Sequence, residues 1–164
     1  IIIDSPVEEM NKLRRTLITA GPDGKQSWND LKAKGIEYIK EKSSSKSSTD
    51  QRGNATLSVD KLNSVISKMD ADGKLESLYG KKQAQTLRDL AEMSKVIYTA
   101  PPGAINTSGT ASAIITALDT VGTFGVTGIP VPAVAVLRQS AKYIKNREVR
   151  NRINESLNYT KQTP

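Results

Sequence analysis

"KKQAQTLRDLAEMSKVIY", residues 81–98, is the stretch that decides the fold class of this chain. Apolar side chains recur in it at spacings of three and four residues, which is the period of one face of an α-helix. The prolines and glycine of residues 101–103 follow directly and end the predicted helix. The apolar face consists of Ala84, Leu87, Leu90, Ala91, Ile97 and Tyr98.

Further helices are predicted on both sides of this segment. The stretch "LSVDKLNSVISKMD" has an apolar face of the same period behind Ser58, a residue type preferred at the N-cap. Ser5 and Glu8 have the spacing of a capping box at the start of the chain, and a second helix begins near Ser27. The predicted helices span residues 5–20, from near 27, 57–70, 81–98, 108–121 and about 133–158.

No alternation of apolar and polar residues persists long enough to predict a sheet. We therefore expect an all-α protein of elongated helical hairpins or a bundle. Residues 43–56 are rich in serine, and such a composition is typical of a flexible linker. That linker separates a predicted N-terminal helical hairpin, residues 1–42, from a C-terminal helical domain, residues 57–164.

The composition limits the classes of function. The 164 residues include no cysteine and no histidine, which removes thiol nucleophiles, disulfides, and the commonest general base and metal ligand. Hydrophobic residues make up 37% and aromatic residues only 4%, so the core has to come from aliphatic side chains. The chain begins without methionine or a signal-peptide pattern, and we expect it to be a processed product or a piece of a longer polypeptide.

Motifs of catalysis and cofactor binding are missing from the sequence. The segment around Asp70 resembles a calcium loop, but its glycine falls at position 4 where an EF-hand needs position 6. The paired carboxylates on the predicted helices are interpreted as solvated charges. We therefore expect no enzyme activity and no catalytic, cofactor-binding or metal-binding residues.

Residues 120–137, "TVGTFGVTGIPVPAVAVL", form an apolar segment without a single charge in a chain of net charge +7. As one membrane-spanning helix the segment is poor, because its two prolines would break the helix. A core loop and a packing or membrane-inserting element remain as alternatives, and we favour packing between identical subunits with conditional membrane contact. The candidate packing residues are Gly122, Phe124, Gly125, Gly128, Pro130 and Pro132.

The C-terminal segment holds most of the net positive charge. Residues 131–164 contain seven lysines and arginines and two glutamates. Four of the cations would lie on one face of a continuous helix: Arg138, Lys142, Lys145 and Arg152. Such a basic ridge is either a solvated helix surface or a surface that faces the phosphates of DNA or anionic lipids. Any binding to DNA is expected to be independent of base sequence.

The stretch "LYGKKQAQTLRDLAEMSKVIYTAPPGAINTSGTASAI", residues 78–114, combines a Leu-Arg-Asp-Leu helix, a Pro-Pro-Gly stop and an Asn-Thr-Ser-Gly-Thr start. It resembles the C-terminal portion of the DNA-injection (ejection) proteins of P22-like and related short-tailed bacteriophages. The resemblance covers about the last 90 residues. Some relatives contain a muramidase domain, but none is visible here, so no catalytic residue is transferred.

The resemblance implies a virion protein that leaves the particle on infection and enters the host cell envelope. It implies assembly into an oligomeric channel that helps genome translocation. The implied partners are copies of the chain, other phage ejection or tail and portal proteins, double-stranded DNA without sequence specificity, and the host inner membrane. The alternative hypothesis is a helical DNA-binding scaffold module without a membrane role.

Overall fold

The computed structural model describes residues 3–49 and 55–159, and it is predominantly α-helical, as the sequence predicts. The elements are α1 (Val7–Thr19), α2 (Pro22–Ser43), β1 (Ser44–Thr49), β2 (Ala55–Leu57), α3 (Val59–Ala71), α4 (Lys74–Ser94), α5 (Val96–Thr99), α6 (Thr107–Phe124), the 3-10 turn η1 (Val126–Gly128), α7 (Val131–Ala141) and α8 (Arg147–Tyr159).

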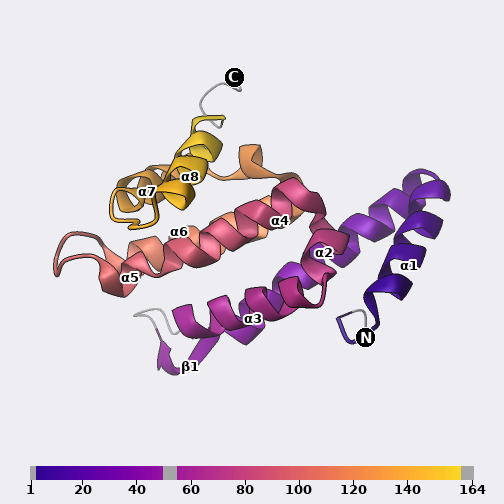
Figure 1. Ribbon diagram of the computed structural model, residues 1–164, viewed down its shortest axis with the longest axis horizontal. Helices are drawn as coiled ribbons and strands as arrows, with labels where there is room; N and C mark the ends of the chain where they lie inside the picture. The colour runs from indigo at the N-terminus through magenta and orange to yellow at the C-terminus, as the bar shows by residue number, and fades with distance from the viewer. Residues whose placement is uncertain (1–2, 50–54, 160–164) are drawn as a thin grey trace.

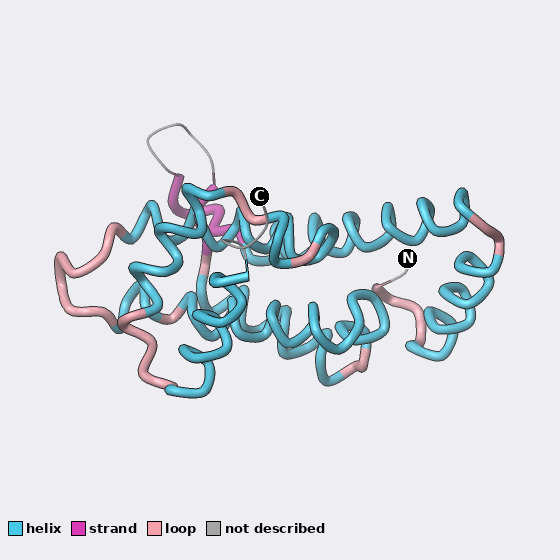
Figure 2. The backbone as a smooth tube through the Cα atoms, turned by 90° about the horizontal axis from the view of Figure 1, so that it is seen from above, coloured by secondary structure: helices cyan, strands magenta, loops and turns pink. Residues whose placement is uncertain are grey.

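The longer helices form an elongated assembly (Figure 1). α4 packs against α3 on one side and against α6 and α8 on others, while α7 lies on α6. The antiparallel helices α1 and α2 make a hairpin whose turn lies at one end of the long axis, as Figure 2 also shows. The candidate functional site lies around α7 and α8, away from this hairpin (Figure 1).

A single hydrophobic core joins the helices on both sides of residues 50–54. Ile36 and Ile39 of α2 belong to the same buried cluster as Leu87 of α4 and Leu118 of α6. Full burial of one such side chain stabilises the folded state by about 1.5–3 kcal/mol. The predicted N-terminal hairpin and the predicted C-terminal domain therefore share their packing surfaces, through α2.

Side-chain caps are found at two helix starts, and the one at Ser58 confirms the prediction. The Ser58 hydroxyl accepts a hydrogen bond from the Lys61 amide at the start of α3. The Asn106 side chain accepts one from the Gly109 amide at 2.9 Å at the start of α6. Each cap satisfies a backbone donor that has no partner within the helix.

The starts of the first two helices differ from the prediction. α1 begins at Val7 with Pro6 at its N-cap, where the sequence predicted Ser5 as the cap and Pro6 as the first helical residue. α2 begins at Pro22, five residues before the expected Ser27, because a glycine with φ of 89° precedes a proline that is preorganised for the first turn.

Most of the described residues of the predicted linker have regular structure, which the sequence did not indicate, while the flexibility of the linker stays a prediction. Ser43 is the last residue of α2, and β1 pairs with β2 as an antiparallel ribbon in which Ser44 lies opposite Leu57. The Ser58 amide donates to the Ser43 carbonyl at 2.7 Å and closes the base of this ribbon. Serine is compatible with such a ribbon, because the hydrogen bonds between the two strands join backbone groups and need no particular side chain. Residues 50–54 of the expected linker lie outside the described residues.

α4 extends seven residues further toward the N-terminus than predicted and bends at Gly80. Gly80 has φ of 76° and ψ of 165°, a non-helical backbone conformation that glycine adopts without steric cost. The short part before the bend contacts α1, where Ser77 donates to the Asn11 side chain at 2.8 Å. Beyond the bend, α4 runs away from α1 toward the opposite end of the molecule (Figure 1).

Candidate functional site

The uncharged segment 120–137 is divided among three elements. Its first residues complete α6, which ends at Phe124, and Gly125 follows with φ of 79°. η1 turns the chain, with the Gly128 amide donating to the Gly125 carbonyl at 3.1 Å, and α7 then begins. The two prolines start a helix here: Pro130 is the N-cap of α7 and Pro132 lies in its first turn.

Two large apolar side chains are exposed at the ends of this connection. Phe124 is 77% exposed and Val131 is 75% exposed. Phe124 is the one phenylalanine of the chain, and its large apolar ring lies in solvent. We call Phe124 and Val131 the apolar pair.

The candidate packing residues lie in different environments. Gly122 is buried, and a Cβ added to it would be 2.4 Å from Ile36 Cγ1 and 3.2 Å from Tyr79 Cε1. A Cβ on Gly128 would be 2.9 Å from Phe124 Cβ, so η1 lies against the last turn of α6. Phe124, Gly128, Pro130 and Pro132 are exposed, and their contact with another copy stays a prediction.

The continuous helix predicted over about 133–158 is wrong. α7 ends at Ala141 and α8 begins at Arg147, with a turn between them. The Asn146 side chain accepts hydrogen bonds from the amides of Glu148 and Val149 at 3.0 and 3.2 Å, as an N-cap does. Asn146 before an acidic first turn is a capping signal that the sequence carries and our prediction overlooked.

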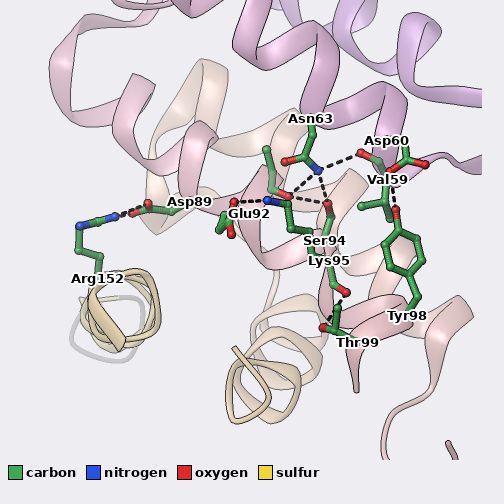
Figure 3. A network of polar contacts seen from close by, with 11 residues as sticks. Val59, Asp60, Asn63, Asp89, Glu92, Ser94, Lys95, Tyr98, Thr99 and Arg152 are labelled. Atoms are coloured by element: carbon green, nitrogen blue, oxygen red, sulfur yellow. Dashed lines mark hydrogen bonds and ion pairs between the residues drawn. The ribbon is translucent and has the colours of Figure 1, made fainter. Parts of the chain in front are cut away.

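The break separates the four cations of the predicted basic ridge. Arg138 donates to the Leu157 carbonyl at 3.0 Å and so joins α7 to α8. Arg152 donates to both carboxylate oxygens of Asp89 on α4, at 2.8 and 2.9 Å (Figure 3). Hydrogen bonding to Asp89 raises the pKa of Arg152, against the opposing effect of burial. Both arginines are thus engaged within the chain.

Asp89 is a residue that the sequence did not single out. Asp89 is only 4% exposed, and it lies in α4 among the residues that this helix buries. A buried carboxylate is stable only when it is paired, and Arg152 is its ion-pair partner. Periodicity alone gives no sign of a partner 63 residues away.

Lys142 and Lys145 remain on the surface, in and beside the turn between α7 and α8. We call them the exposed lysine pair. Both side chains are exposed, and neither has a hydrogen bond or ion pair to another described residue. Of the predicted ridge, these two residues are the ones whose charge is available to an outside phosphate.

Neither a metal centre nor a membrane span is found in the described part of the chain. Residues 3–49 and 55–159 hold no group of three acidic side chains placed to bind a metal ion. None of their helices combines the length and the apolar character that crossing a bilayer requires.

Comparisons of this chain with protein-family models, with curated proteins and with solved structures found no match.

Proposed function

We propose that this chain is a non-catalytic structural protein of a phage particle that assembles with copies of itself into a channel for the genome. The observation that carries the proposal is the exposure of the apolar pair, Phe124 and Val131. Exposed large apolar side chains favour association because their contact removes apolar surface from water. The phage setting, the passage of DNA and the contact with the host envelope come from the resemblance of residues 78–114.

The test is the oligomeric state in sedimentation velocity over a wide range of concentrations. Wild type is expected to form larger species as its concentration rises. The double variant Phe124→Ser, Val131→Ser is expected to stay monomeric with unchanged helical content, because both side chains point into solvent. Tyr98→Ser is the control, since Tyr98 is 57% exposed on another part of the surface. A monomeric wild type, or equal association in all three proteins, contradicts the proposal.

The second candidate is a helical scaffold that binds DNA without sequence preference, and the exposed lysine pair favours it. Replacing Lys142 and Lys145 by Gln is expected to weaken binding to a random duplex and to lower the salt slope by about two. The matched double variant Lys34→Gln, Lys95→Gln removes two lysines that already pair with Glu37 and Glu92. Equal loss in the two variants would reduce DNA binding to a general effect of net charge.

A further inference from the structure

A shallow, open groove lies along the second half of α1. It has a volume of about 680 Å³ and is lined by Asn11, Arg14, Arg15, Ile18 and Thr19. These residues follow one another at spacings of three, one, three and one, which places them along one face of a helix. Such a row is the surface through which helices pack.

At one end of this row Asn11 contacts a second helix, although Asn11 itself stays exposed. The short part of α4 before Gly80 lies beside it, where Asn11 accepts a hydrogen bond from Ser77. The bend at Gly80 then directs α4 away. The groove therefore continues the contact between α1 and α4 beyond the point where α4 bends away from α1.

The groove is also positively charged. Arg14 and Arg15 line it, and Lys32 of α2 lies close enough for Arg14 to help burial in lowering the pKa of that lysine. No carboxylate of the described residues forms an ion pair with any of the three. Cations that share a groove without a counter-charge favour an anionic occupant.

The occupant also has to cover carbon. Ile18 is 39% exposed within the groove, and phosphates offer no apolar surface to cover it. A symmetric contact with a second copy through this face is disfavoured, because it would set Arg14 and Arg15 of the two chains against each other. We propose that the groove binds an amphipathic helix of another polypeptide, with apolar residues against Ile18 and carboxylates paired to Arg14 and Arg15.

The probe is a synthetic amphipathic helix of about 20 residues with a leucine face bordered by glutamates. The reference peptide has glutamine at each glutamate, and a random DNA duplex is the third probe. Binding is followed by fluorescence anisotropy, and a photoreactive group on the peptide maps where it binds. Arg14→Gln with Arg15→Gln is expected to weaken the acidic peptide at least about tenfold, because two charge-assisted hydrogen bonds are lost.

Lys68→Gln with Arg147→Gln is the matched control, since it removes the same charge at two exposed positions elsewhere and is expected to change peptide affinity less than about twofold. Ile18→Glu is the second variant: it sets a like charge in the groove and should abolish binding while the helical content stays unchanged.

Four results overturn the proposal. They are the lack of binding to wild type, equal binding of the acidic and glutamine peptides, equal losses in the two double variants, and cross-links that map away from α1. Loss of DNA affinity confined to the Arg14 and Arg15 variant would assign the groove to nucleic acid instead. Loss of self-association in that variant would assign it to a second copy.

Discussion

At the scale of single residues, Gly122 shows how one missing side chain determines the contact between two helices. Ile36 of α2 occupies the space that a Cβ on Gly122 of α6 would take. Gly35 has the same role on α2, where an added Cβ would be 2.4 Å from the Tyr79 hydroxyl. Three helices therefore meet at two glycines, an isoleucine and a tyrosine.

Gly122→Ala is expected to lower the free energy of unfolding by about 1–3 kcal/mol, because the new methyl group overlaps Ile36 in a packed core. Ser112→Ala, at an exposed position of the same helix, is the control and should change that energy by less than about 0.5 kcal/mol. Urea titrations of both variants measure the difference. A Gly122→Ala protein as stable as wild type would show that α2 and α6 can separate at no cost.

Tyr79 predicts how stability falls at alkaline pH. Burial raises the pKa of its hydroxyl above the ordinary value, and the hydroxyl donates to the Lys32 carbonyl at 2.9 Å. The folded state thus favours the protonated form, so its contribution is complete below about pH 10, the pKa in the unfolded chain, and is lost as pH rises further.

Tyr79→Phe should therefore lose stability less steeply than wild type above about pH 10, although it is about 1 kcal/mol less stable at neutral pH without the hydrogen bond. Unfolding by urea at a series of pH values gives both quantities. Parallel curves for the two proteins above that pH would contradict the assignment.

At the scale of elements, α8 depends on an ion pair with α4. Arg152→Gln leaves the buried Asp89 carboxylate without its charged partner and should lower the free energy of unfolding by about 2 kcal/mol. This is less than for a fully buried pair, since the Arg152 side chain is 41% exposed. Arg147→Gln, at an exposed position of α8, should have an effect below about 0.5 kcal/mol. Equal urea midpoints for the two variants would contradict the structural role of the pair.

Elements were predictable where their signals are local. Ser58 and Asn106 cap the helices that follow them, and the periodic apolar residues of 81–98 lie in α4 and α5. The bend at Gly80 was not predictable, since a glycine allows a bend without requiring one. The pairing of Arg152 with Asp89 was not predictable either, because it depends on how distant helices pack.

At the scale of the whole molecule, the shared core predicts one unfolding transition. Trp28, the one tryptophan of the chain, is buried in the hairpin of α1 and α2, whereas circular dichroism reports on all helices. The two signals should give the same midpoint in urea, because Ile36 and Ile39 join that hairpin to α4 and α6. An earlier transition of Trp28 fluorescence would show that residues 1–42 form a separate domain.

The site was less predictable than the fold. Net charge correctly indicated a basic C-terminal segment, but a helical projection placed Arg138 and Arg152 on an open ridge that the break at Asn146 removes. The unusual character of residues 120–137 was visible in the sequence. Which of its side chains face solvent depends on α2, more than 80 residues earlier, through the contact of Ile36 with Gly122.

The contact between α2 and α6 can form only late in the synthesis of the chain on the ribosome. Lys40 pairs with Asp119, a residue translated 79 positions later. At about 5–20 residues per second, α2 waits roughly 4–16 seconds before its partner has been made. During that interval the nascent chain holds Ile36 and Ile39 without the helix that buries them, so the ribbon of β1 and β2 and helix α3 are the first neighbours available to shield them.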